Sequence, residues 1–243
     1  MSWAQRMQSV VQMVYPPRCL SCGGMVGEDF GLCTECWKET PFIAGLCCDL
    51  CGRGLSGRSD RQEICDDCLT VARPWDRGRA ALSYEGRARR IVLALKHGDR
   101  HDIARPAAQW MARVTRPIVE ADTLIAPVPL HIGRHLRRRY NQSALLAAAL
   151  GRVLDREFVP DLLRRDSPTP MLRGRSYAER FDILSGRLSV TPRHEVLVRG
   201  RSVLIVDDVM TSGATLAAAA EACLASGANA VFVSVLARAG KDA

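Results

Sequence analysis

The chain has 243 residues, of which 47% are hydrophobic and only 5% are aromatic. This length allows one large domain and one small domain, and a core of Ala, Val, Leu and Ile suits an α/β protein better than a sandwich of strands. The longest apolar stretches, such as Ala144–Leu150, fall far short of the roughly 20 residues with which a helix crosses a bilayer. No membrane span is therefore expected.

Charge is distributed unevenly around the formal net value of +8. Residues 1–75 carry 7 Lys and Arg against 9 Asp and Glu, whereas the rest of the chain carries 27 against 17. The basic part is expected to attract phosphates, either on a nucleotide-like ligand or on nucleic acid. For most of the Lys and Arg residues in this part, an ordinary position on the solvated surface is the simpler explanation.

Residues 1–18 predict a short helix with one apolar face that needs a partner surface. Four polar residues interrupt the apolar run and no small-residue cleavage site follows, so the segment does not indicate a signal peptide and the chain is expected in the cytoplasm. We interpret it as a helix that docks onto the chain's own domains, with membrane contact as the minor alternative. The apolar face comprises Trp3, Met7, Val10, Val11 and Val14.

Nine of the ten cysteines lie between positions 19 and 68, and eight of them form four Cys-x2-Cys pairs. Two such turns supply four thiolates for one tetrahedral site, so we predict a double zinc ribbon over residues 19–70 with two structural zinc ions. A disulfide framework would require secretion, and iron–sulfur ligation fits four evenly paired turns less well. The predicted ligands are Cys19, Cys22, Cys33 and Cys36 in one set and Cys48, Cys51, Cys65 and Cys68 in the other.

Two alternatives stay open within this module. Cys47 is a spare thiol or replaces Cys48 as a ligand, and the two sets of ligands can exchange pairs. Cys223 lies outside the module and is most simply a small buried side chain. Because thiolates fill every ligand position, no position is left for catalysis, and the module is expected to be structural or to dock other proteins.

The most informative segment is residues 201–215, RSVLIVDDVMTSGAT. The β-branched run Val203–Val206 predicts a strand buried on both faces of a parallel sheet, which Asp207 and Asp208 are expected to end. A loop of small residues then leads into an Ala-rich helix, so the order predicts a βαβ unit with its ligand site at the carboxyl ends of the strands. The later boundaries are expected at Ser226, where the helix ends, at Gly227, its cap, and at Val231–Val235, the next strand.

The residue types in this segment suit a phosphorylated sugar. Backbone N–H groups of a small-residue loop that opens a helix form a phosphate cradle, and hydroxyl groups add donors. Gly213 lets the backbone approach the ligand closely. Two adjacent carboxylates are acceptors for a ribose diol and can help to hold Mg2+.

The string VDDVMTSGAT closely resembles the signature with which type I phosphoribosyltransferases bind phosphoribosyl pyrophosphate (PRPP). The resemblance implies that Asp207 and Asp208 hold the ribose hydroxyls while the following loop holds the 5′-phosphate, with Mg2+ accompanying the ligand. The implied loop residues are Thr211, Ser212, Gly213, Ala214 and Thr215.

Together with the ribbons, four further blocks resemble the ComF family, which includes ComFC and the GntX proteins, over nearly the whole chain. They are PPRCLSCGG at 16–24, LSYEG at 82–86 with LALKHGDR at 93–100, APVPLHIGRHLRRRYNQS at 126–143 and LLRRDSPTPMLRGRSYAER at 162–180. This chain has Arg139 where the family usually has Gly, Met171 where it usually has Gln, and Asp182 near a usual Asn. The resemblance therefore implies that the chain binds PRPP, but it indicates no particular acceptor.

Two cations are the candidates for neutralising a pyrophosphate leaving group. Lys96 lies between a helical stretch and the turn at Gly98, and a cluster of arginines follows the predicted strand Thr123–Val128. From the cluster we choose Arg138 and pair it with Lys96, although a surface position is an equal alternative for any single arginine. The cluster comprises Arg134, Arg137, Arg138 and Arg139.

The predicted architecture is a type I phosphoribosyltransferase fold, a parallel sheet flanked by helices over residues 79–239, with a small N-terminal zinc-ribbon module. The boundary between them is placed near residues 70–78. Strands are expected near Ala80–Tyr84, Thr123–Val128, Phe158–Leu163, Val203–Val206 and Val231–Val235.

The function predicted from these features is pentosyl transfer, in which a nucleophile of an unidentified acceptor displaces pyrophosphate from C1 of the ribose. The sequence offers no convincing general base. The alternative, implied by the resemblance to ComFC, is a non-catalytic protein of DNA uptake in natural transformation that senses PRPP, handles single-stranded DNA or works with DNA-uptake proteins. The chain has no basic stretch interleaved with aromatic residues of the kind that stacks bases, which weakens direct DNA binding.

Overall fold

The computed structural model describes residues 16–27, 31–97, 100–130, 140–166, 177–184 and 186–240. Most of the N-terminal segment that predicts a docking helix lies outside these residues, and so does Arg138. Within the described ranges, no helix combines the length and the apolar character that a membrane span requires.

Four parallel strands form the central sheet in the order β1-β6-β5-β2. They are β1 (Arg77–Ser83), β6 (Ala230–Arg238), β5 (Ser202–Met210) and β2 (Leu124–Pro127), and a separate antiparallel pair comprises β3 (Leu163–Arg165) and β4 (Leu188–Val190). The helices are α2 (Thr34–Lys38), α3 (Asp66–Thr70), α4 (Gly86–His97), α5 (Ala104–Thr115), α7 (Gln142–Leu154), α8 (Tyr177–Leu184), α9 (Glu195–Val198) and α10 (Ala214–Ala225), with 3-10 turns η1 (His101–Ile103), η2 (Arg116–Ile118) and η3 (Pro192–His194).

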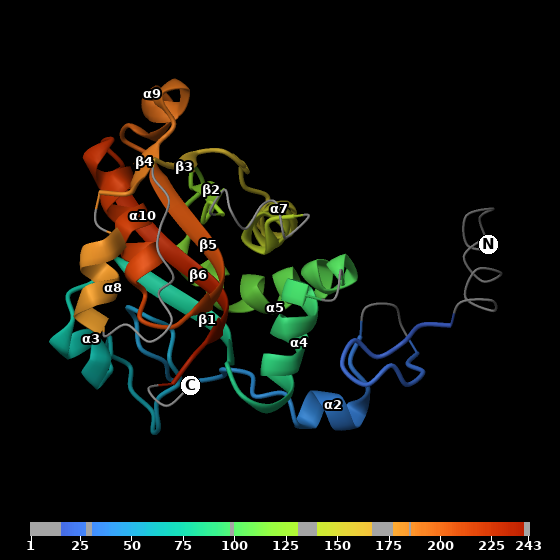
Figure 1. Cartoon of the computed structure of the whole chain (residues 1–243). Helices are drawn as coiled ribbons and strands as arrows, with labels where there is room; N and C mark the ends of the chain where they lie inside the picture. Colours follow the sequence, from blue (N-terminus) through green and yellow to red (C-terminus); the bar gives the residue numbers. More distant parts are fainter. Residues whose placement is uncertain are drawn as a thin grey trace.

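Helices cover both faces of the sheet, with α8 and α10 on one side and α4, α5 and α7 on the other (Figure 1). The two faces of β5 show why its apolar run is continuous. Val203 and Ile205 pack among the side chains of α10, whereas Leu204 and Val206 pack with those of α4, α5 and α7. Successive side chains of a strand point to opposite faces, so a strand buried on both sides needs apolar residues at every position.

The βαβ unit around β5 confirms the predicted order and corrects one boundary. Gly227, at φ +89°, follows the end of α10 as its predicted cap, and β6 contains the predicted strand. Asp207 and Asp208 do not end β5, which continues through Met210 because β6 goes on pairing with it. The two carboxylates therefore belong to a fixed strand rather than to a loop.

The prediction of a core strand at Phe158–Leu163 is wrong. Only Phe158 forms a parallel bridge, to Ile125 of β2, and β3 then pairs with β4 outside the main sheet. Val159 donates its N–H to the Ile125 carbonyl, but the next residue is Pro160. Proline has no N–H with which to continue the ladder, so pairing stops after one bridge.

The second half of the cysteine-rich segment covers the free edge of β1. Ile43 donates its N–H to the Ala81 carbonyl and Ser83 donates to the Pro41 carbonyl, while Gly78 donates to the Asp49 carbonyl. An exposed edge strand is open to pairing with other chains, and this segment occupies that edge. The ribbon module is thus attached to the sheet through its backbone.

Two glycines make this attachment possible. A Cβ on Gly78 would lie 2.3 Å from the Leu50 carbonyl oxygen, and one on Gly52 would lie 2.3 Å from the Ala80 nitrogen. Both neighbours are backbone atoms, which cannot move aside as a flexible side chain would. The contact between ribbon and sheet therefore has no room for a side chain at either position.

We expect Gly78→Ala to destabilise the zinc-loaded protein by about 2–3 kcal/mol, because the new methyl group forces the ribbon away from β1. Thermal unfolding should show this as a midpoint lower by roughly 4–12 °C. The matched control is Gly54→Ala in the same module, whose Cβ would meet Ile43 at 3.7 Å, an ordinary contact. Equal midpoints for the two variants would show that the close approach at Gly78 does not matter.

Candidate functional site

The site forms where β5 extends past its neighbour β2. The last residue of β2, Pro127, pairs with Val206, and Val128 donates its N–H to the Val206 carbonyl. Pro129 follows and has no N–H to donate. Beyond Val206 the β2 side of β5 is therefore released from the sheet, at the carboxyl ends of the strands where ligands bind in open α/β sheets.

Asp207 is partly buried at this point and is held by two donors. Its Oδ1 accepts hydrogen bonds from the Ser143 hydroxyl at 2.7 Å and from the Asp208 N–H at 2.8 Å. Burial, followed by the charge of Asp208, raises the pKa of Asp207 to about 6, against the lowering effects of Ser143 and Lys96. At neutral pH the Asp207 carboxylate is ionised. Because its surroundings raise its pKa, this ionised state costs free energy in the unliganded protein.

Asp208 is buried and forms an ion pair with Lys96, whose Nζ lies 2.9 Å from Asp208 Oδ1. Lys96 occupies the last turn of α4, and one residue just before α7 and one at its start hold that turn in place. Tyr140 donates its hydroxyl to the Leu95 carbonyl at 2.7 Å, and Gln142 Nε2 donates to the Lys96 carbonyl at 3.4 Å. The fold thus brings Lys96 to the acidic pair, although 111 positions separate Lys96 from Asp207 in the sequence.

The segment 140–143 connects all parts of this corner. Asn141 donates from Nδ2 to the Val128 carbonyl, and its Oδ1 accepts the Ser143 N–H as the N-cap of α7. Ser143 in turn reaches Asp207. Each side chain of the sequence Tyr-Asn-Gln-Ser therefore fixes one element of the site, a role that the sequence alone did not reveal.

The loop after β5 lines an open pocket of about 190 Å³. Its lining consists of Asp207, the continuous run 209–216 and Arg180 of α8. Gly213 adopts φ +85°, a conformation that other residues rarely take, and precedes the first turn of α10. The first N–H groups of a helix have no acceptor within it and carry the positive end of its dipole, so the pocket favours an anion.

Arg180 is a site residue that sequence reasoning missed. It lies in the YAER end of a block that resembles the ComF family, but nothing in the sequence shows that α8 packs against α10 and thereby brings Arg180 to the pocket. The other cation chosen with Lys96, Arg138, lies outside the described residues.

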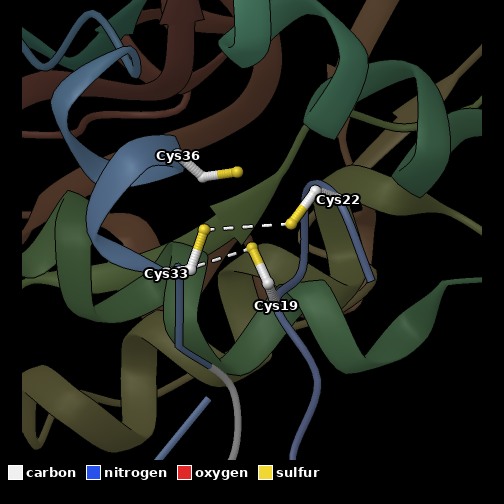
Figure 2. A group of neighbouring side chains, drawn as sticks. All are labelled: Cys19, Cys22, Cys33 and Cys36. Atoms are coloured by element: carbon white, nitrogen blue, oxygen red, sulfur yellow. Dashed lines mark hydrogen bonds between the residues drawn. The ribbon is translucent and has the colours of Figure 1, made fainter. Parts of the chain in front are cut away.

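The cysteines form two separate tetrads of consecutive pairs (Figure 2 shows the first). In each, the four Sγ atoms lie within 4.8 Å of one another. Cys22 Sγ lies 3.8 Å from Cys33 Sγ, and Cys51 Sγ lies 3.6 Å from Cys65 Sγ. Tetrahedral zinc with bonds of about 2.3 Å to sulfur separates its ligands by about 3.8 Å, so both donor sets fit one zinc ion each.

Backbone N–H groups donate to the sulfurs in both tetrads, as expected for thiolate ligands. Cys33 donates to Cys19 Sγ at 3.3 Å, and Cys65 donates to Cys48 Sγ at 3.4 Å. The two tetrads differ in their surroundings. Cys22 of the first tetrad is exposed, whereas all four cysteines of the second are buried in the main hydrophobic core.

The remaining cysteines are outside both tetrads. The second tetrad contains Cys48 and not its neighbour Cys47, which is therefore outside both donor sets, and burial raises the pKa of the Cys47 thiol. The pairs are not exchanged between the sets. Cys223 is fully buried on α10, which raises the pKa of its thiol to about 12.

We expect Cys51→Ser and Cys22→Ser each to lose one of two zinc ions per chain, as measured by mass spectrometry of the native protein. Cys51→Ser should lower the thermal midpoint more, because its tetrad belongs to the core and zinc binding contributes directly to folding. Cys47→Ser is the adjacent control and should retain both ions. Loss of zinc from Cys47→Ser would contradict the ligand assignment.

The raised pKa of Asp207 predicts a pH-dependent penalty in the unliganded protein. A carboxyl whose pKa is about 6 when folded and about 4 when unfolded stabilises the folded state at low pH and loses that contribution as pH rises through 6. Asp207→Asn keeps an acceptor for Ser143 but cannot ionise. Relative to wild type, its free energy of urea unfolding should rise by about 2 kcal/mol between pH 4 and pH 8. A constant difference across this range would contradict the shift.

Comparison with known proteins identifies both parts of the chain. One family model, a double zinc ribbon domain, matches residues 10–69, and another, a phosphoribosyl transferase domain, matches residues 141–243. The Escherichia coli K12 protein named DNA utilization protein YhgH is 31% identical over 215 residues, which cover 86% of this chain and 91% of the relative.

Two relatives carry names from natural competence. Competence protein F of Haemophilus influenzae is 29% identical over 205 residues, covering 82% of this chain and 87% of its own. Competence protein ComFC of Bacillus subtilis is 26% identical over 210 residues, which cover 84% of this chain and 82% of the relative. With similarity of this extent across both the ribbons and the sheet domain, the chain belongs to the ComF family, in which a double zinc ribbon is joined to a phosphoribosyltransferase domain.

Proposed function

We propose that the chain binds PRPP together with Mg2+ at the carboxyl end of β5 and transfers its phosphoribosyl group to an acceptor. The observation that carries this proposal is the pocket at the start of α10, whose lining joins Asp207 to the whole loop that follows β5. An anion-binding helix start next to ionised carboxylates matches a ligand with a phosphate at one end and a diol beside it.

Each part of the ligand has a partner in this arrangement. The 5′-phosphate would accept hydrogen bonds from the N–H and hydroxyl groups of residues 211–215, and Arg180 of α8 would add a positive charge. Asp207, already oriented by Ser143, would accept a hydrogen bond from a ribose hydroxyl. This bond would offset the cost of the ionised carboxylate, so the ligand would relieve the repulsion between the two aspartates.

The leaving group requires positive charge. Lys96 balances Asp208 in the unliganded protein and lies on the side of α4, where it would meet the pyrophosphate when the ligand binds. Mg2+, held by the two carboxylates and the diphosphate, would supply the remaining neutralisation. The nucleophile would form a bond to C1 of the ribose while the bond between C1 and the pyrophosphate oxygen breaks. The electron pair of the broken bond would leave with pyrophosphate. Arg138 is proposed for the same role.

The names of the relatives favour a role in DNA uptake, and as the second candidate function we propose such a role with PRPP bound but no transfer. They are called DNA utilization and competence proteins. Asp207 is the carboxylate that lines the pocket among the described residues, and its neighbour Asp208 is paired with Lys96, so no separate general base is assigned. In this reading PRPP binding regulates a surface that contacts single-stranded DNA or DNA-uptake proteins.

We place either function in the cytoplasm. Zinc thiolate tetrads persist where thiols stay reduced, and none of the ten cysteines is joined by a disulfide.

Calorimetry of the zinc-loaded protein with PRPP and Mg2+ tests the proposed site. Asp207→Asn should weaken binding by about 10- to 100-fold, because it removes a charged hydrogen-bond acceptor that the folded state holds in position. Asp161→Asn, which alters a carboxylate paired with His194 away from the pocket, is the control and should bind as wild type does. Absence of Mg-dependent PRPP binding by the wild type would refute the proposal.

Release of pyrophosphate in the presence of a panel of nitrogenous bases separates the two candidates. Release that depends on Asp207 supports transfer. Binding without release, together with binding of single-stranded DNA that weakens as salt rises, supports the role in DNA uptake.

A further inference from the structure

A buried arginine connects the second zinc tetrad to the phosphate loop. Arg73 follows α3 in the ribbon module, and its Nε donates to Cys68 Sγ at 3.5 Å. Its Nη1 donates to the Ser212 carbonyl at 2.7 Å. One guanidinium group thus bridges a zinc ligand and a loop residue that are 144 positions apart in the sequence.

The loop packs closely against this arginine. A Cβ on Gly213 would lie 2.7 Å from Arg73 Nη1 and 3.3 Å from the Trp75 ring, so the glycine at the positive φ angle rests on the Arg73 side chain. The guanidinium carbon lies 5.4 Å from the centre of the Trp75 ring, and Trp75 donates its indole N–H to the Leu50 carbonyl. The ribbon therefore holds Arg73 from two sides.

A second buried arginine makes a parallel connection. Arg238, at the end of β6, donates from Nη1 to the carbonyls of Met210 at 3.2 Å and Thr211 at 2.8 Å. Its Nη2 lies 3.6 Å from Asp67 Oδ2, and Asp67 immediately precedes the ligand Cys68. Two guanidinium groups thereby attach three successive carbonyls, that of the last residue of β5 and the first two of the loop, to two successive residues of the second ribbon.

The direction of these arginine–carbonyl hydrogen bonds determines where the neighbouring N–H groups point, and those N–H groups are the ones available to a phosphate. In a planar trans peptide the C=O and the following N–H point in opposite directions. With the carbonyls of residues 210, 211 and 212 turned toward the arginines, the N–H groups of residues 211, 212 and 213 point away from them. These residues line the pocket, and successive N–H groups that face the same way form an anion-binding concavity.

The first tetrad has no comparable connection among the described residues. Its ribbon packs against the other side of the domain, where Leu20 joins the core of α4 and α5 and Glu39 pairs with Arg87 of α4. In Figure 1, α2 of this ribbon lies beside α4, whereas α3 of the second ribbon lies near β1 and α8. Within the described ranges, the second tetrad is the one whose contacts reach the loop.

We propose that the second tetrad, through the positioning residues Arg73 and Arg238, sets the conformation of the phosphate loop, so that zinc at this tetrad and PRPP at the loop bind cooperatively. This inference rests on the proposed PRPP site. Coupling between two binding sites is reciprocal, so each ligand should raise the affinity of the other by the same factor.

The test uses the full chain loaded with two zinc ions and compares Arg73→Met with Arg77→Met. Arg77 also joins the second ribbon to β1, through an ion pair with Asp49 at 2.9 Å, but within the described part of the chain its side chain forms no hydrogen bond or ion pair with the loop. Calorimetry with PRPP and Mg2+ should show binding about tenfold weaker in Arg73→Met and nearly unchanged in Arg77→Met. Arg73→Lys, which keeps the charge but not the fork of donors, should fall between wild type and Arg73→Met.

A second readout does not depend on activity. Competition with a chelating dye measures the two zinc affinities, and saturating PRPP should raise one of them about tenfold while the other, from the first tetrad, stays constant. Arg73→Met should markedly reduce this rise, because Arg238 alone then connects the second ribbon to the loop. In the cobalt-substituted protein, PRPP should also shift the absorption bands of one thiolate site, by less in Arg73→Met than in the wild type.

The outcomes separate this inference from the proposed function. If wild type fails to bind PRPP, the proposed site is wrong. If wild type binds PRPP but neither zinc affinity responds, or if Arg73→Met and Arg77→Met weaken binding equally, the coupling through Arg73 is refuted. Circular dichroism and zinc content confirm that the compared variants are folded, and Arg73→Lys replaces Arg73→Met if the latter is not.

Discussion

The candidate site depends on one difference in length between neighbouring strands. β5 stays in the sheet through Met210 because β6 pairs with it to the end, whereas β2 stops at Pro127 and the chain then reaches Pro129. This leaves Asp207 on a rigid strand yet open on one side. Had β2 continued, its backbone would cover the acidic pair. Had β5 stopped at Val206, the carboxylates would sit on a loop and lose the fixed relation to Ser143 and Lys96 that their hydrogen bonds require.

Local features of the sequence were predictable, and contacts across the fold were not. The spacing of the cysteine pairs identified both tetrads, because two ligands on one turn must share an ion. The apolar run before Asp207 and the small residues after it identified the βαβ unit and its loop. The strand expected at Phe158–Leu163 failed because Pro160 interrupts its pairing, a signal that was present in the sequence but outweighed by the apolar pattern.

Arg73, Ser143 and Arg180 illustrate what sequence reasoning could not supply. Ser143 reaches Asp207 across 64 positions, and Arg73 reaches Ser212 across 139. Nothing in the neighbourhood of either residue distinguishes it from a surface cation or a helix cap. Their roles follow from the packing of α7 and of the second ribbon against the sheet, and packing partners are fixed only when the whole chain has folded. Lys96 was chosen from its charge and its place before the turn at Gly98, but the contacts with which Tyr140 and Gln142 hold that turn could not be predicted from the sequence.

The acidic ribbon and the basic domain are complementary in charge where they meet. Each tetrad of four thiolates around a divalent ion carries a net charge of about −2. Arginines surround the second one: Arg73 donates to its sulfur, while Arg77 and Arg79 pair with Asp49 of the same ribbon. Buried guanidinium groups are stable only with such partners. Because Arg73 and Arg238 also hold the loop carbonyls, the charge that attaches the ribbon to the sheet is the same charge that orients the loop. A ribbon whose only task was to cover the edge of β1 would need the backbone contacts at Ile43 and Gly78 but neither of these arginines.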